Sequence, residues 1–347
     1  MRCPAAPYCE QAVRDAAERI CSESGLNCRR DEFGNVWVHL KTNPRLRPLV
    51  LAAHLDHPAF KIIRRVSPDR LLAQFRGGVP DQYFRPRTRL RLMPGGETAH
   101  LAKRIAREKQ FRIQASKPLS DLPQFAVWDL PDFSLRDGEI HGRACDDLIG
   151  VAAILAALIE LKKTRARVNV IGLLTRAEEV GFHGALALAY SGKLPKRSLV
   201  ISLETSREIP PVKMGAGVII RVGDRTSIFD SEATRFLSEV AGGLAREDKT
   251  FAFQRALLSG GTCEATAFQE FGYQTAAVCV ALGNYHNCAQ KNRIAPEYVS
   301  VADCCRMVRL MTAAARYMPD YLRLVGALPK RLAALSRSAK VALPQRP

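Results

Sequence analysis

The sequence predicts an α/β fold, in which a mostly parallel central sheet has helices on both faces and carries an inserted small β-rich domain. Two observations lead to this prediction. Near-continuous apolar runs, such as residues 168–174 and 275–282, alternate with longer helical patterns, which is typical of buried parallel strands. Between residues 61 and 138 the pattern changes to short β-rich runs broken by Gly and Pro, which is typical of a small barrel or sandwich.

The individual elements follow from the spacing of apolar residues. Strands are expected at the apolar or alternating runs 35–40, 48–53, 168–174, 198–203, 216–222 and 275–282. Helices are expected where apolar residues recur every three or four positions, at 8–23, 147–163, 183–191, 231–244, 264–271 and 300–317. Within the insert, only residues 99–109 show helical periodicity.

These elements divide the chain into three parts. An α/β domain is expected to comprise residues 1–60 and 139–318, and residues 61–138 form the inserted domain. Residues 319–347 form a basic C-terminal tail, in which leucines recur at helical spacing. This tail is expected to be either a short amphipathic helix or a loose terminus.

The positive charge is concentrated in two of these parts. The 347 residues carry a formal net charge of +18, to which residues 61–138 contribute 16 Lys and Arg against 8 Asp and Glu. Residues 316–347 contribute another 7 against 1. Such charge can attract nucleic acid or anionic membranes, or it can be a solvated surface. Because zinc-finger spacing and interleaved aromatic residues are both missing, nucleic acid is not the expected partner.

The apolar runs and the cysteines indicate the compartment. The longest uninterrupted apolar run, Val151–Ile159, is too short to cross a bilayer, so a transmembrane segment is not expected. The ten cysteines include no C-x-x-C pair, and the N-terminus lacks the apolar core of an export signal. We therefore expect reduced cysteines and a cytoplasmic location.

Histidines and carboxylates stand where the predicted strands end and where one helix begins. These residues are His54, Asp56, Asp146, Asp147, Glu178, Glu179, Glu204 and His286. Each has an ordinary structural explanation when taken alone, since Asp146 and Asp147, for example, can cap a helix. Together they are expected to meet, because the carboxyl ends of parallel strands share one edge of a sheet. Divalent cations relieve the repulsion between clustered carboxylates, and His with carboxylate suits zinc, cobalt or manganese.

Two histidines and three carboxylates predict a site for two divalent metal ions. One carboxylate must then bridge the ions, and Asp146 is best placed because it opens a helix. His54 and Glu204 would complete the shell of one ion, and Glu179 and His286 that of the other. Zinc is the expected metal.

Two further carboxylates receive catalytic roles. Asp56 lies two residues after His54, so on an extended strand both side chains point the same way and Asp56 can orient the imidazole. Glu178 is left free beside the metal ligands. It is therefore the candidate general base, which takes a proton from water and passes it to a leaving amine.

Several segments resemble the TET-type glutamyl/leucyl/lysyl aminopeptidases, which share their fold with other co-catalytic zinc exopeptidases. The matching segments occur in the order of that family and are AAHLDH (52–57), GRACDDLIGVAA (142–153), LLTRAEEVGFHGA (173–185), VISLET (200–205), LSGGTCEATAF (258–268) and LGNYHNC (282–288). The resemblance implies the same ligands and base as above, peptide substrates, and a PDZ-like or barrel-like dimerisation domain as the insert. It also implies homo-oligomers, up to a dodecameric shell built from dimers.

Three positions depart from the family pattern. Leu148 stands where Arg usually follows the Asp-Asp pair, and Asn284 replaces Arg before Tyr285. The usual Gly-Gly-Thr-Asp-Ala reads Gly-Gly-Thr-Cys-Glu-Ala, so that Cys263 occupies the acidic position and Glu264 follows it. These differences affect the substrate pocket and assembly contacts and leave the proposed ligands intact.

Three functions are compatible with the sequence. The first is a metal-dependent aminopeptidase that uses a water molecule activated by two metal ions. The second is an amidohydrolase that deacylates N-acyl amino acids or other small amides at the same site, because the reacting group is again an amide. The third is a catalytically silent binding scaffold, against which the complete set of ligands argues.

Overall fold

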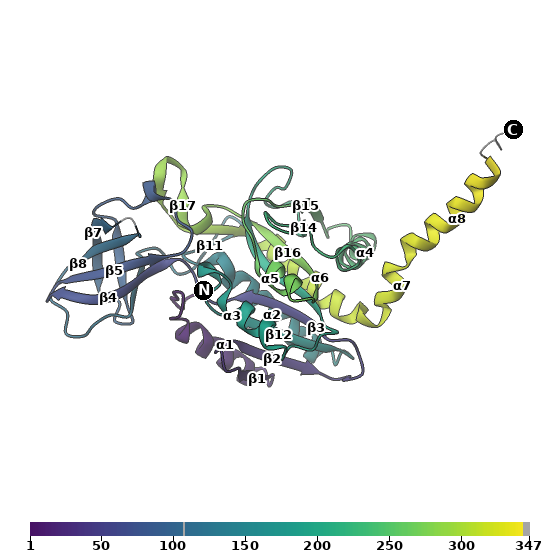
Figure 1. Ribbon diagram of the computed structural model, residues 1–347, viewed down its shortest axis with the longest axis horizontal. Helices are drawn as coiled ribbons and strands as arrows, with labels where there is room; N and C mark the ends of the chain where they lie inside the picture. The colour runs from purple at the N-terminus through teal and green to yellow at the C-terminus, as the bar shows by residue number, and fades with distance from the viewer. Residues whose placement is uncertain (107, 343–347) are drawn as a thin grey trace.

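The computed structural model describes residues 1–106 and 108–342, and it has an α/β body with a β-barrel on one side and a helical C-terminal extension on the other (Figure 1). The eight strands of the central sheet lie in the order β1-β2-β12-β3-β13-β16-β14-β15. Their bounds are β1 Asn27–Arg30, β2 Val36–Lys41, β12 Asn169–Thr175, β3 Leu49–His54, β13 Leu199–Arg207, β16 Gln274–Leu282, β14 Val218–Gly223 and β15 Phe253–Leu257.

The centre of this sheet is parallel. Strands β12, β3, β13 and β16 run in the same direction, whereas β2 pairs antiparallel with β12 and β14 pairs antiparallel with β16. Every residue of β3 and β12 is buried, because helices cover both faces of the sheet. The predicted α/β fold with a mostly parallel sheet is thus confirmed.

The helices divide between the two faces, because successive side chains of a strand point to opposite sides. Leu49 and Leu51 of β3 share a core with α1, α2, α4 and α6, whereas Val50 and Ala52 pack with α3 and α5 on the other face. The bounds of these helices are α1 Gln11–Glu23, α2 Cys145–Lys163, α3 His183–Ser191, α4 Ser231–Glu247, α5 Glu264–Glu270 and α6 Val301–Tyr317.

Six strands of the insert form a closed barrel in the order β4-β5-β8-β7-β6-β9. Their bounds are β4 Ala59–Ser67, β5 Arg70–Arg76, β6 Arg89–Met93, β7 Thr98–Ala106, β8 Gln110–Ala115 and β9 Phe125–Trp128. Phe60 lies in the barrel core, with its ring edge-on to Phe75, Phe111 and Trp128. This core is separate from the helix-covered core of the sheet.

The helical periodicity at residues 99–109 does not correspond to a helix. Strand β7 occupies most of this segment, and residue 107 lies outside the described residues. The strand pairs with β6 on one side and β8 on the other, so its backbone groups find partners across the barrel. Ala99 and Leu101, two positions apart, both point into the barrel core, which is the period of a strand.

Short elements connect the barrel, the sheet and the site. They are the strands β10 Ser134–Arg136, β11 Glu139–Gly142, β17 Cys288–Ala289, β18 Arg293–Ile294 and β19 Glu297–Ser300, and the 3-10 helices η1 Asp81–Tyr83, η2 Glu178–Val180, η3 Tyr285–Asn287, η4 Gln290–Asn292 and η5 Met318–Asp320. Strands β10, β11 and β19 form a small antiparallel sheet. Through β19, this sheet lies beside the end of β16.

The C-terminal tail contains two helices, α7 (Tyr321–Val325) and α8 (Ala327–Ala342), and its residues 343–347 lie outside the described residues. Helix α7 packs against α4, whereas α8 extends away from the body (Figure 1). Within the described ranges, none of the helices has both the length and the apolar character that crossing a membrane requires.

Candidate metal centre

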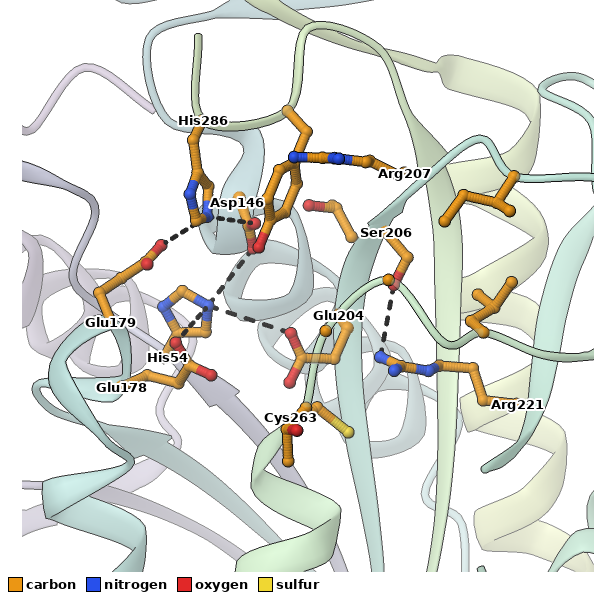
Figure 2. A pocket seen from close by; sticks show the side chains of 17 residues that line it. His54, Asp146, Glu178, Glu179, Glu204, Ser206, Arg207, Arg221, Cys263 and His286 are labelled. Atoms are coloured by element: carbon orange, nitrogen blue, oxygen red, sulfur yellow. Dashed lines mark hydrogen bonds and ion pairs between the residues drawn. The ribbon is translucent and has the colours of Figure 1, made fainter. Parts of the chain in front are cut away.

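The structure brings the predicted site residues together at the carboxyl edge of the parallel strands (Figure 2). Three of them belong to parallel strands or directly follow one: His54 ends β3, Glu204 lies near the carboxyl end of β13, and His286 lies in η3 after β16. Glu178 and Glu179 begin η2 after β12, and Asp146 lies at the start of α2. These six residues line the same pocket. The predicted convergence of strand ends explains this arrangement.

Asp146 is the residue that joins the two histidines. Its Oδ1 lies 3.3 Å from Nε2 of His54, and its Oδ2 lies 3.5 Å from Nε2 of His286. All three side chains are buried. The two oxygens of one carboxylate therefore face two different imidazoles, as a bridging ligand would.

Three overlapping groups of side chains could each hold a metal ion, and within each group the candidate ligand atoms lie within 4.8 Å of one another. The groups are His54-Asp146-Glu204, Asp146-Glu179-His286 and His54-Glu178-Glu179. The shortest of the contacts to the other carboxylates joins Nε2 of His286 and Oε1 of Glu179 at 3.1 Å, whereas His54 Nε2 lies 4.0 Å from both Glu178 Oε2 and Glu204 Oε2.

The residues present fit a divalent metal. Oδ1 of Asp146, Oδ2 of Asp147 and Oε1 of Glu179 are buried and lack hydrogen-bond partners among the described residues. An unpaired buried carboxylate is costly unless it binds a proton or a cation. Imidazole nitrogens and carboxylate oxygens are the ligands that zinc and its neighbours prefer. The site is therefore chemically suited to hold metal.

Burial and mutual repulsion perturb these carboxyl groups. Burial raises the pKa of Glu204 to about 7, and it raises the pKa of Glu178 well above its usual range, with further contributions from Glu179 and Glu204. Burial acts in the same direction on Asp146, but the nearby imidazoles of His286 and His54 hold the pKa of this carboxyl below its usual range. Asp146 is thus the carboxylate that stays ionised between the two imidazoles.

The sequence profile described as M42 glutamyl aminopeptidase matches residues 121–297, just over half of the chain. The chain belongs to the M42 glutamyl aminopeptidase family. This match confirms the resemblance drawn from the sequence motifs. Membership of this family supports a metal-dependent peptidase.

Individual relatives agree with the M42 assignment. A protein from Acetivibrio thermocellus that carries an aminopeptidase assignment is 32% identical over 115 residues, so the match spans 32% of this chain and only 34% of that protein. The TET1 peptidase of Pyrococcus horikoshii has a similar structure, with a TM-score of 0.75 at 22% identity over 90% of this chain and 96% of the other. An aminopeptidase from Desulfurococcus kamchatkensis gives 0.74 at 21% identity over 92% and 94%. The structural likenesses concern the fold.

Asp56 contacts His54 in a different manner from the one expected. Its carboxylate Oδ1 lies 3.7 Å from Nδ1 of His54, and it is the main-chain carbonyl of Asp56, at 3.1 Å, that accepts a hydrogen bond from this nitrogen. The carboxylate itself accepts the backbone N–H groups of Glu178 and Glu179, at 2.9 and 3.2 Å. Asp56 therefore holds both the imidazole and the segment that carries the candidate base.

The M42 site also contains residues that the sequence interpretation missed. Oε2 of Glu297, at the start of β19, accepts the backbone N–H of Asp146 at 3.0 Å, and its Oε1 accepts the backbone N–H of His286 at 2.8 Å. His57 donates from Nδ1 to the main-chain carbonyl of Asp146 at 2.7 Å. His57 lies inside the AAHLDH segment and could have been noticed there. Glu297 lies 151 residues from Asp146, and its surroundings in the sequence give no sign of the contact.

Proposed function

We propose that this M42-family chain is a metal-dependent aminopeptidase that removes N-terminal residues from peptides. The observation that carries the proposal is the shared position of Asp146. It belongs both to the group with His54 and Glu204 and to the group with Glu179 and His286. Two divalent ions, zinc by preference and cobalt or manganese as substitutes, would be held by these two groups.

The ions would supply Lewis acidity, which polarises a peptide carbonyl and favours the loss of a proton from water. Glu178 is the group that moves this proton. Its carboxylate lines the cavity, its side chain is 12% exposed, and its Oε2 lies 4.0 Å from Nε2 of His54. Burial raises the pKa of Glu178, which favours its accepting a proton, and its place beside His54 lets it return that proton to the leaving amine.

The test uses a panel of aminoacyl p-nitroanilides and their N-acetylated counterparts with metal-loaded protein. An aminopeptidase cleaves only the substrates with a free amine, and Glu178→Gln abolishes that cleavage. Cleavage of the acetylated substrates instead would favour deacylation of N-acyl amino acids. Absence of cleavage on both series in a metal-loaded protein would favour a binding scaffold.

We also infer that the chain forms homo-oligomers. The inference is supported by its structural relatives, since a P. horikoshii relative was solved as a dodecamer and the TET1 peptidase can assemble into a tetrahedron or an octahedral shell. The barrel would be the dimerisation domain. Light scattering coupled to size-exclusion chromatography should give a mass of at least two chains, and a monomer at micromolar concentration would contradict this inference.

A further inference from the structure

The segment that carries His286 lies between the α/β body and the barrel. Residues Cys288 and Ile294, which follow His286 in the short strands β17 and β18, pack against the barrel core. Figure 1 shows β17 between the barrel and the body. The other predicted metal ligands all belong to elements of the body: His54, Asp146, Glu179 and Glu204. His286 is therefore the ligand whose position depends on the barrel.

The barrel also contacts the ring of His286 directly. The main-chain carbonyl of Gly78, which follows β5, accepts a hydrogen bond from Nδ1 of His286 at 3.0 Å. Because a carbonyl can only accept, Nδ1 carries the proton of the neutral ring and Nε2 keeps a lone pair. Nε2 lies 3.1 Å from Oε1 of Glu179 and 3.5 Å from Oδ2 of Asp146. The Gly78 carbonyl thus turns the nitrogen that can bind metal toward the other ligands.

Lys109 holds the segment around Gly78 in place. Its Nζ donates to the carbonyl of Val79 at 2.9 Å and to that of Gly77 at 3.4 Å, on either side of Gly78. Lys109 lies in the turn between β7 and β8, where its own carbonyl accepts the backbone N–H of Phe75 at 2.9 Å. The side chain is half-buried, so these carbonyls replace water around its ammonium group. One lysine therefore fixes the two peptide groups that flank the Gly78 carbonyl.

Gly77 fixes the same segment against the connection between the two domains. Its φ of 118° lies in the region that favours glycine. A Cβ atom added to Gly77 would lie only 2.6 Å from Cβ of Pro58. Pro58 lies between β3 and β4, where the chain passes from the body into the barrel. The loop that presents the Gly78 carbonyl is therefore held from two sides.

Two more barrel side chains hold the chain that follows His286. Oη of Tyr83 donates to the main-chain carbonyl of Ala289 at 3.0 Å. Nη2 of Arg85 donates to the main-chain carbonyl of Lys291 at 3.2 Å. These carbonyls belong to β17 and η4, directly after the segment with the imidazole. The barrel thus holds His286 through its ring and through the chain that follows it.

The group formed by His54, Asp146 and Glu204 is held within the body instead. Nδ1 of His54 donates to the main-chain carbonyl of Asp56 at 3.1 Å, and Glu204 accepts a hydrogen bond from Ser202 at the same distance. His54 lies in β3, and Ser202 and Glu204 lie in β13, both parallel strands of the central sheet. The affinity of this group for an ion should therefore not depend on the barrel.

We infer that the barrel is part of the metal centre, because it orients His286 through the Gly78 carbonyl, with Lys109 as the positioning residue. The ion held by Glu179 and His286 then depends on the inserted domain, whereas the ion held by His54 and Glu204 does not. The inference rests on the two-ion site of the proposed function. It goes beyond that function by giving the insert a role in filling one of the two positions.

The experiment measures zinc dissociation constants of metal-stripped protein by competition with a chromogenic chelator. Two backgrounds separate the two positions. Glu204→Ala removes a ligand of the body-held position and leaves the one with His286, whereas His286→Ala leaves the position with His54. Lys109→Met is then added to each background. It should raise the dissociation constant about tenfold in Glu204→Ala, as the loss of a group that supports a ligand does, and leave it unchanged in His286→Ala.

Two further variants sharpen the comparison. Lys103→Met is the matched control, since Lys103 is an exposed lysine of β7, and it should change neither constant. Tyr83→Phe removes only the hydroxyl that holds Ala289. It should weaken zinc binding in Glu204→Ala by at most about tenfold, the range of one hydrogen bond, and it tests the barrel's role without Lys109→Met.

Unchanged zinc binding of Lys109→Met and Tyr83→Phe in the Glu204→Ala background would overturn the inference. Equal losses in both backgrounds would also overturn it, because a general structural defect acts on both positions. If wild type then still binds two ions and cleaves free-amine p-nitroanilides, the proposed function stands. Absence of cleavage together with a loss confined to the Glu204→Ala background would overturn only the aminopeptidase function. A wild type that binds fewer than two ions would overturn the two-ion site and the inference together.

Discussion

Glu297→Gln tests how the chain holds the two segments that carry Asp146 and His286. The carboxylate of Glu297 is fully buried and accepts one backbone N–H from each segment, at 3.0 and 2.8 Å. Glutamine keeps one oxygen for one of these donors and turns an NH₂ group toward the other. One buried N–H is then unpaired, which costs about 1–3 kcal/mol of unfolding free energy.

The effect on metal binding should exceed this general loss. Groups that support metal ligands typically change affinity by about 10–100-fold when they are removed. We therefore expect Glu297→Gln to raise the dissociation constant for zinc by roughly tenfold or more in competition titrations with a chromogenic chelator. Unfolding in urea, measured on the metal-free protein, gives the stability change separately.

Asp303→Asn is the matched control for this experiment. Asp303 is also fully buried, and its carboxylate accepts the backbone N–H groups of Gly215 and Gly217 at 2.7 and 2.9 Å, outside the metal-binding cluster. Asp303→Asn should therefore also lose stability, partly through its ion pair with Arg306, without a change in zinc affinity. If both variants weaken zinc binding equally, or if Glu297→Gln leaves it unchanged, the idea that Glu297 positions the two ligands is refuted.

Three further predictions concern the site itself. Glu178→Gln should retain bound metal but lower kcat by about a hundredfold or more, and unchanged kcat would remove Glu178 from the role of general base. His286→Ala should bind one ion fewer per chain by elemental analysis, and a full complement would contradict its role as a ligand. Burial raises the pKa of Asp56 and Glu204 to about 7 and that of Glu264 to about 8. The folded metal-free protein therefore holds protons on these carboxyl groups that the unfolded chain releases above roughly pH 4–5. These groups should therefore lower the Tm of the metal-free protein as the pH rises from 5 to 8. Zinc should reduce this decline in Tm, and Glu264→Gln should also make it smaller. Equal slopes of Tm against pH in Glu264→Gln and wild type would contradict the raised pKa of Glu264.

The location of the site could be predicted from the sequence because parallel strands end at a common edge. His54 and Glu204 lie in strands that the apolar runs predict, and His286 follows another such strand. Asp146 opens a helix that was also expected. Because the carboxyl ends of the parallel strands lie at one edge of an α/β sheet, these side chains lie close together.

The supporting contacts could not be predicted in the same way. Glu297 reaches Asp146 and His286 only because β19 pairs with β11, just before the Asp146 segment, and lies beside the end of β16, just before His286. Pairing between such distant segments leaves no periodic signal in the sequence. The hydrogen bonds of the Asp56 carboxylate to the η2 segment depend in the same way on the exact path of a loop.

The misleading periodicity at residues 99–109 has a related cause. Leu101 and Ile105 lie four positions apart, as in a helix, whereas Ala99 and Leu101 lie two positions apart, as in a strand, so local preference alone could not decide between the two. Pairing of β7 with β6 and β8 decides it, because closing the barrel satisfies the backbone groups of all three strands. Tertiary contacts therefore override the weak local signal.

A metal titration of the stripped protein tests directly whether bound metal gives the chain aminopeptidase activity. Zinc is added in steps to the metal-free chain, and bound ions per chain are counted while hydrolysis of a free-amine p-nitroanilide and its N-acetylated counterpart is followed. We expect hydrolysis of the free-amine substrate to appear as two ions bind and the acetylated substrate to stay intact. Hydrolysis that is unaffected by stripping the metal, or that is equal for both substrates, would contradict a metal-dependent aminopeptidase.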